Sequence, residues 1–159
     1  MVIHIEPYAP HHTSQIISLK IADGQERFTL LPEGFISESP PHLHRHVILL
    51  EGTVIGYFRI DTAYPENYPF CPQTSLGLRA LLIDSRQQGK GYGQAAMAAL
   101  PMYLRDVYPD HHAVYLTVNC QNPVAHRCYI KAGFDDTKEL YLGGPAGPQH
   151  IMRMDLINR

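Results

Sequence analysis

Three scarcities limit what this chain can be. It has only three cysteines in 159 residues, an odd and sparse set that argues against a disulfide scaffold and indicates reduced thiols in a cytoplasmic protein. No apolar run approaches the ~20 residues that a membrane-spanning helix needs, and the N-terminal sequence lacks the basic-then-apolar layout of a signal peptide. Basic residues are not in excess, since the formal net charge is −2, which argues against general nucleic-acid binding.

The remaining composition is that of one globular domain. With 45% apolar and 18% charged residues, a chain of this length can bury a proper core. At roughly 100–200 residues per domain, we expect a single domain over residues 1–159, and no linker, repeat or low-complexity stretch divides the sequence.

Hydrophobic periodicity predicts an α/β chain. Helices are predicted at 11–22, from 93 onward and at 123–134, and loops at 61–74 and over most of 23–41, where QERFTLL could add one short helix. Pro101 is expected to kink or shorten the second helix, at roughly 3 kcal/mol. Strand patterns cover 1–6, 46–50, 53–60, 75–84 and 113–119, followed by ELYLGG and HIMRMDL. A meander followed by strand–helix–strand–helix indicates a mixed sheet.

The strongest local signal is the glycine-rich loop Gln88-Gly89-Lys90-Gly91-Tyr92-Gly93, between the strand LRALLID and the Ala-rich helix. Glycines allow backbone N–H groups to approach a phosphate closely, and the helix adds unpaired donors and the positive end of its dipole. A strand, a glycine loop and a helix together therefore favour an anion site, in particular one for a pyrophosphate.

Two nucleotide-binding motifs do not fit this loop. A Walker A loop requires Lys after its last glycine, but Gln94 follows Gly93. A dinucleotide fingerprint begins with Gly89-Lys90-Gly91 but has Gln94 where the third glycine belongs. The plain alternative is a glycine-rich turn without a ligand.

A family resemblance gives a third interpretation. IDSRQQGKGYGQAAM resembles the acetyl-CoA signature Q/R-x-x-G-x-G/A of the GCN5-related N-acetyltransferases (GNAT), through Gln88, Gly91 and Gly93. Further along, VNCQNPVAHRCYIKAGF resembles the family's downstream motif of Asn, Ala, Tyr and a closing Gly-Phe, with Asn122 and Tyr129 in the matching positions. The resemblance covers about residues 46–134.

The resemblance implies a fold and a co-substrate. The fold is a mixed, mostly antiparallel central sheet of about six to seven strands with helices on both faces. The co-substrate is acetyl-CoA, and no metal is implied. Its pyrophosphate is expected on the loop amides and its pantetheine arm along the strand edge. The implied cofactor-binding residues are Leu81, Leu82, Ile83, Gln88, Gly89, Lys90, Gly91, Tyr92, Gly93, Gln94 and Asn122.

Direct acetyl transfer also needs an acid and a base. Tyr129 matches the family's general acid, because a phenol stays protonated at pH 7; its alternative role is a core-facing aromatic. Deprotonating an amine of pKa ~10.4 costs about 4–5 kcal/mol at pH 7. Many relatives carry a glutamate on one of two strands, but those places here offer Thr117 and no acid in LRALLI. The base is therefore either a water chain ending on backbone and Asn119 or an acid or His from the N-terminal loops, such as Glu33 or His46.

We therefore expect an N-acetyltransferase that transfers acetyl from acetyl-CoA to a primary amine by direct attack. The acceptor is expected to be a small molecule, polyamine-like or another small amine, because the central region loosely resembles relatives that act on polyamines. An acyl-CoA-binding sensor or pseudoenzyme of the same fold is the alternative. A homodimer is plausible, with no nucleic-acid or membrane partner.

Ten histidines remain unassigned. His42, His44 and His46 alternate as strand residues do, which would allow a metal site, but no acid or cysteine stands at ligand spacing, so solvent-facing or substrate-lining roles are preferred. His11-His12 and His111-His112 are expected at the surface. The glycine- and proline-rich loop 143–150 is expected to form a wall beside the acceptor site or a dimer edge.

Overall fold

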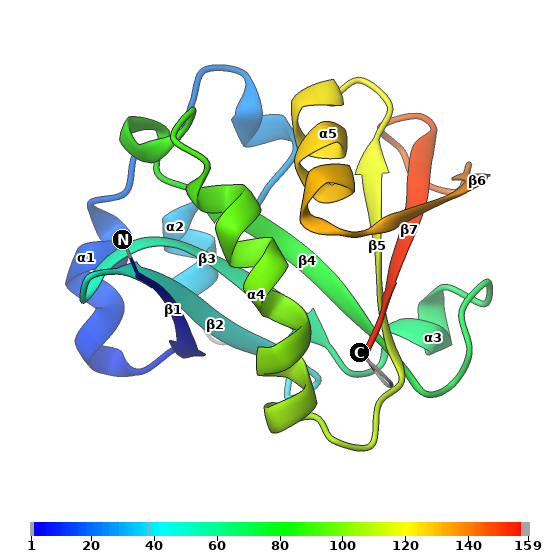
Figure 1. Ribbon diagram of the computed structural model, residues 1–159. Helices are drawn as coiled ribbons and strands as arrows, with labels where there is room; N and C mark the ends of the chain where they lie inside the picture. The colour runs from blue at the N-terminus through cyan, green and yellow to red at the C-terminus, as the bar shows by residue number, and fades with distance from the viewer. Residues whose placement is uncertain (1, 38, 157–159) are drawn as a thin grey trace.

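Seven strands form one sheet in the computed structural model, which describes residues 2–37 and 39–156 (Figure 1). Along the sheet the order is β1-β2-β3-β4-β5-β7-β6, with β4 and β5 parallel and the other described neighbours antiparallel. The strands are β1 (Ile3–Pro7), β2 (Leu43–Leu50), β3 (Thr53–Asp61), β4 (Ser75–Ile83), β5 (Ala113–Asn119), β6 (Asp135–Tyr141) and β7 (Gln149–Asp155).

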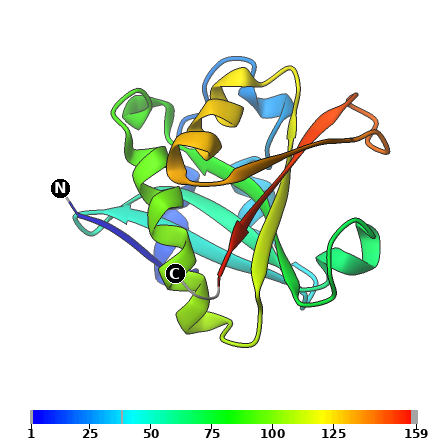
Figure 2. The same ribbon diagram turned by 45° about the vertical axis from the view of Figure 1, so that its right-hand side comes forward.

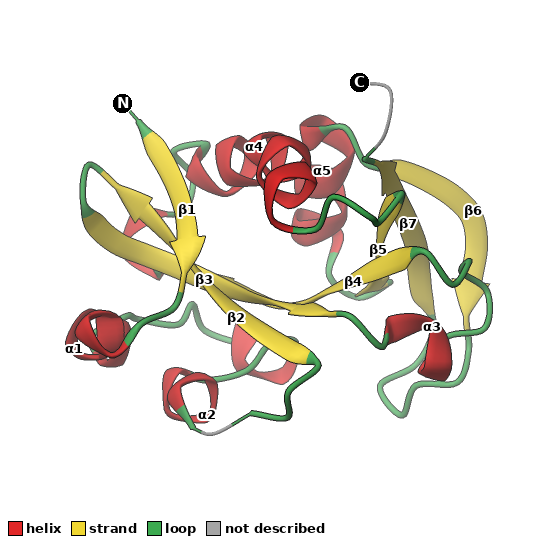
Figure 3. Ribbon diagram, turned by 90° about the horizontal axis from the view of Figure 1, so that it is seen from below, coloured by secondary structure: helices red, strands yellow, loops and turns green. Residues whose placement is uncertain are grey.

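Helices cover both faces of this sheet, as expected. They are α1 (Thr13–Ile17), α2 (Pro32–Ile36), α3 (Tyr64–Asn67), α4 (Tyr92–Val107) and α5 (Pro123–Ala132), with short 3-10 turns at Pro10–His12, Gln25–Arg27 and Ser85–Gln87. Figure 3 shows α4 and α5 on one face and α1 and α2 on the other. Each face therefore has its own apolar core, the larger one built around Met97, Leu100 and Leu104 of α4.

The longer elements lie where the sequence predicts them. β5 has the predicted bounds, and the β2–β3 hairpin turns at Glu51-Gly52. Both turn residues have positive φ, 49° and 84°, which matches the tight turns that fit the twist of paired strands. α5 begins with Pro123 and ends at Gly133, whose φ of 110° is that of a C′ glycine.

Several shorter elements differ from the prediction. The first helix ends at Ile17 rather than residue 22, and α2 and α3 form where loops were expected. Both of these helices have a proline in the first turn, where no backbone N–H is needed. β6 starts at Asp135, earlier than the apolar pattern of ELYLGG suggested, because its edge position leaves most of its side chains exposed.

Pro101 does not shorten α4, so of the two predicted effects, a kink or a shortening, the shortening is wrong. The helix continues to Val107, with Leu100 and Leu104 on either side of the proline fully buried. Burial of these side chains is worth roughly 1.5–3 kcal/mol each. Core packing therefore offsets the unfavourable proline.

Candidate active site

The site begins where the only described parallel strand pair separates. β4 and β5 are paired over just three residues each, Ser75–Gly77 against Ala113–Tyr115. Beyond these residues the two strands diverge, and α5 lies over the open end (Figures 1 and 2). The opening forms a cleft of about 380 Å³, within the size range of small-molecule sites.

A bulge in β4 shapes one wall of this cleft. Between the pairs Tyr57–Leu82 and Arg59–Arg79, β4 has one more residue than β3, and Ala80 adopts a φ of 61°. Bulges bend a strand and redirect its side chains. Leu78–Ile83 all contribute to the lining, so the wall of the cleft is the β4 edge that no longer pairs with β5.

The glycine loop leads from this edge into α4. Gly89 and Gly91 have φ of 78° and 84°, and a Cβ at either position would have no neighbour within 4 Å. Among the described residues, no backbone carbonyl accepts from the N–H groups of Gly89, Lys90, Gly91, Gly93 or Gln94. These donors, at the positive end of a sixteen-residue helix, form an open surface suited to an anion.

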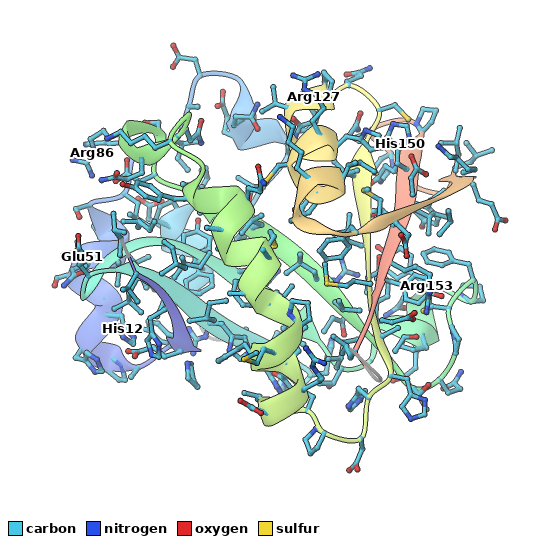
Figure 4. All side chains as sticks on the ribbon, viewed as in Figure 1. His12, Glu51, Arg86, Arg127, His150 and Arg153 are labelled. Carbon is cyan, nitrogen blue, oxygen red and sulfur yellow. The ribbon has the colours of Figure 1, made fainter. Side chains whose placement is uncertain are left out.

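Asp84 and Gln88 hold the loop in place. Asp84 is buried and accepts hydrogen bonds from the backbone N–H of Arg86 (2.9 Å) and from its guanidinium (2.5 Å). Burial alone would raise the pKa of Asp84, but the bonds from Arg86 lower it below its ordinary value. Gln88 donates from Nε2 to the Ile83 carbonyl at 2.9 Å. Asp84 is thus a capping residue, and Arg86 extends outward beside it (Figure 4).

Tyr129 reaches the cleft from α5. Its side chain is 8% exposed and lies edge-on to Phe134, with ring centroids 5.4 Å apart. It lines the cleft together with Cys128. Burial, and then the neighbouring Cys128, raise the pKa of its hydroxyl above the ordinary value, so the group keeps its proton across the physiological range.

Asn122 lines the same cleft but has a structural role as well. It is the N-cap residue of α5, and its Oδ1 accepts from the Ala125 backbone N–H at 3.4 Å. Asn119 is also engaged: Nδ2 donates to the Ala146 carbonyl, and Oδ1 accepts from the Gln121 N–H. Asn119 therefore ties the 143–150 loop to the cleft, which Ala146 and Gln149 line.

Neither candidate base from the N-terminal half lines the cleft. The lining contains Thr117 and Asn119, but no Asp, Glu or His side chain among the described residues. Glu33 is exposed on α2. His46 is 2% exposed and sits under α4, where Tyr103 Oη is 2.6 Å from Nδ1 and Tyr108 Oη is 3.0 Å from Nε2.

The histidines therefore differ in part from the expectation. His46 neither faces solvent nor lines the site, whereas His44 is exposed, with Nδ1 2.7 Å from Tyr108 Oη. His12, expected at the surface, is buried with Nε2 2.7 Å from a Glu6 carboxylate oxygen. Two other groups do bring metal-ligating side chains together. They are Glu6, His11 and His12, and His126, Asp136 and His150; Figure 4 labels His12 and His150.

Six of the twelve residues implied by the resemblance line the cleft: Leu81, Leu82, Ile83, Gln88, Asn122 and Tyr129. The other six, Gly89 to Gln94, continue from the cleft as an exposed turn and the exposed or half-buried start of α4. Sequence reasoning missed Tyr64, Tyr68 and Arg79, which line the side of the cleft opposite Tyr129. The sequence does contain a pointer to Arg79, because it is the one charged residue in the apolar strand SLGLRALLI.

This arrangement, a mixed sheet split between two parallel strands with a glycine loop at a helix start, defines an acyl-transferring enzyme fold. The family model described as the acetyltransferase (GNAT) family matches residues 11–134. The chain belongs to this family and is an acyltransferase.

Curated relatives agree with this assignment. The uncharacterized N-acetyltransferase YbbJ of Bacillus subtilis (strain 168) is 31% identical over 157 residues, covering 94% of this chain and 95% of the relative. The spermine/spermidine N(1)-acetyltransferase of the same organism is 26% identical over 146 residues, covering 91% and 95%.

Solved structures match the fold over nearly the whole chain. The aminoglycoside acetyltransferase AAC(6')-Ib in complex with coenzyme A aligns with a TM-score of 0.73 at 21% identity, covering 97% of this chain and 95% of that one. The ribosomal-protein-S18-alanine N-acetyltransferase from Escherichia coli aligns with a TM-score of 0.67 at 15% identity, covering 99% and 96%. In the described part of the chain, no helix is both long and apolar enough to cross a membrane.

Proposed function

We propose that this domain, residues 1–159, transfers the acetyl group of acetyl-CoA to the primary amine of a small molecule by direct attack. The observation that carries the proposal is the opening between β4 and β5, with Tyr129 in its wall. The names of the curated relatives support N-acetyl transfer.

The residues present fit acetyl-CoA. The loop amides of Gly89 to Gln94, with open space around Gly89 and Gly91, suit the pyrophosphate. The edge of Leu81–Ile83 that does not pair with β5 suits the amide-bearing pantetheine arm, which binds like an added strand. When bound, acetyl-CoA supplies an activated acetyl thioester.

Tyr129 supplies the proton for the thiolate that leaves when the tetrahedral adduct collapses, and the resulting phenolate takes up the proton that the amine nitrogen releases. Its hydroxyl remains protonated because burial raises its pKa, and it lies in the cleft wall. No lining side chain among the described residues accepts a proton near neutral pH as Glu or His does. The amine therefore enters the cleft already neutral, which makes the rate depend on the fraction of neutral amine in solution.

The test is thiol release from acetyl-CoA across a panel of small amines, with mass spectrometry of the acetylated product and calorimetric titration of coenzyme A. Binding together with amine-dependent release is the expected result. Binding without release on any amine would favour the acyl-CoA sensor, which the absence of a lining carboxylate supports as the second candidate. Absence of binding contradicts both functions.

A further inference from the structure

Three arginines lie in a row across the sheet beside the cleft. In the antiparallel register, Arg45 of β2 is opposite Arg59 of β3, and Arg59 is opposite Arg79 of β4. Directly opposite residues project from the same face of a sheet. Tyr57, two residues before Arg59, packs into the core beneath α1 and α2, so the arginines are on that face.

The two outer arginines have partners. Arg45 donates from Nη1 to the carbonyls of Phe35, Ile36 and Ser37 at the end of α2, at 3.1–3.3 Å. Arg79 donates from Nε to Asp61 Oδ2 at 3.0 Å and from Nη2 to the Tyr68 hydroxyl at 3.2 Å. No described residue accepts from Nη1 of Arg79.

The middle arginine lacks such compensation. The Nε of Arg59 is buried and has no hydrogen-bond partner among the described residues. Burial, and then the nearby Arg79, lower the pKa of Arg59 from its ordinary value. Asp61 is the one carboxylate whose negative charge favours the charged form of both Arg59 and Arg79. The pair therefore has a surplus of positive charge next to the cleft, and a buried polar group without a partner is costly.

Arg79 carries this charge into the cleft. It is the single charged side chain in the described lining, where it stands with Tyr64 and Tyr68. Those two rings stack with centroids 4.2 Å apart, and the guanidinium lies 5.4 and 5.1 Å from them. Arg79 projects from the sheet face that α1 and α2 cover. Tyr129 and the glycine loop lie on the opposite face, which α4 and α5 cover. Arg79 therefore faces the half of the cleft left for the acceptor.

We propose that the amine acceptor carries an anionic group, a carboxylate or a phosphate, and that Arg79, backed by Arg59, binds it; this rests on the acetyltransferase activity proposed above. The planar guanidinium fork matches both oxyanions. A polyamine bound here would place its ammonium groups near Arg79 with no carboxylate in the described lining to balance them. The acceptor is thus an amino acid or an aminoalkyl phosphate rather than a polycation.

The test compares matched amines on the full-length chain. Initial rates of thiol release are measured with common amino acids against their carboxamides, with O-phosphoethanolamine against ethanolamine, and with spermidine. Rates are corrected to the neutral-amine fraction. We expect kcat/KM to favour the anionic member of a pair by about tenfold or more; the amino-acid and phosphate arms distinguish the two oxyanions.

Two variants test whether the preference for anionic amines depends on Arg79. Arg79→Gln is expected to remove the preference by raising KM for the anionic amine about tenfold or more, while the neutral partner changes little. Arg153→Gln is the matched control, because Arg153 also bonds to a tyrosine and an aspartate, Tyr115 and Asp155, but lies outside the cleft (Figure 4). It should keep the preference.

Several outcomes overturn the inference while leaving acetyl transfer intact: a preference for spermidine or for the neutral amines, or an equal loss on both amines in Arg79→Gln. If that variant does not fold, the wild-type comparison alone decides. If no amine supports thiol release, the proposed activity itself fails and the inference fails with it.

Discussion

At the scale of single residues, the catalytic role of Tyr129 can be tested without disturbing the fold, because no described residue hydrogen-bonds to its hydroxyl. Tyr129→Phe removes one oxygen and keeps the ring against Phe134. We expect kcat to fall about 10²–10⁴-fold, the usual contribution of a general acid, with coenzyme A affinity unchanged by calorimetry. Tyr115→Phe is the control, since Tyr115 is equally buried at 8% exposed and lies outside the cleft. Full activity in Tyr129→Phe would remove it from the mechanism.

His46 predicts a pH dependence of stability. Burial, and then the neighbouring His44, lower its pKa from 6.5 to about 4. The unfolded chain therefore binds more protons between these values, so the free energy of unfolding is greatest above about pH 6.5 and decreases as the pH falls to about 4. The loss from this residue is about 3 kcal/mol at most. Urea unfolding at several pH values checks this expectation.

Two variants isolate that contribution from other titrating groups. His46→Gln keeps a polar partner for Tyr103 and Tyr108 but cannot titrate, so its loss of stability between pH 6.5 and 4 should be smaller than that of the wild type. His112→Gln changes an exposed histidine and should behave as the wild type does. Identical pH profiles for wild type and His46→Gln contradict the burial argument.

The residues of the site were only partly predictable. Gln88 and Tyr129 follow from local sequence, because each belongs to a short motif with fixed spacing, and Leu81 follows from its place on the strand before the glycine loop. Arg79 and Tyr68 come together only in the fold, through the register of β3 on β4 and a helix inside a proline-rich loop. His46 was misplaced because alternation along a strand identifies a face but not what covers it.

At the scale of elements, a substitution in the glycine loop should weaken coenzyme A binding by more than its small cost in stability explains. Gly91→Ala places a methyl group in open space at a φ of 84°, so the strain is roughly 1 kcal/mol. The same methyl group occupies space beside the N–H groups at the start of α4, and coenzyme A affinity is expected to fall about tenfold or more by calorimetry.

Gly52→Ala is the matched control for that prediction. Gly52 has the same φ of 84° and the same open surroundings, but it lies in the β2–β3 turn. Its stability loss should match that of Gly91→Ala in urea unfolding, and its coenzyme A affinity should equal that of the wild type. Equal affinities for all three proteins would show that the loop does not bind coenzyme A.

Elements were predictable in proportion to their length and burial. β5 and α5 have strong periods and defined ends, and their bounds match the sequence closely. α2 has five residues, too few for a period to show, and forms because Phe35 packs on Tyr57 with centroids 4.0 Å apart. The predicted span of α4 matches closely, but a shortening at Pro101 was wrongly allowed for, because the proline acts locally whereas the burial of Leu100 and Leu104 depends on the whole core.

At the scale of the whole molecule, the net charge of −2 does not show where the basic side chains lie relative to the cleft. Arg45, Arg59 and Arg79 are separated by fourteen or more residues in sequence and become neighbours only when β2, β3 and β4 pair. The resemblance of the central region to relatives that act on polyamines suggested a polyamine-like acceptor. The lining, which has an arginine and no carboxylate among its described residues, favours an anionic group instead.

The open sheet also predicts where a bound co-substrate stabilises the protein. In the described part of the chain, the strand pairing that links β1–β4 to β5–β7 consists of three residue pairs between β4 and β5, so a ligand along the β4 edge beyond them should strengthen the link between the two halves of the sheet. At one hundred times its dissociation constant, coenzyme A adds about 2.7 kcal/mol, or a rise in Tm of about 5–11 °C for a chain of this size. Amide hydrogen exchange should slow at Leu81–Ile83 and in the glycine loop, while the β2–β3 hairpin, remote from the opening, keeps its rates. Slowing spread evenly over the sheet, or confined to strands other than β4, would contradict binding in the opening between the strands.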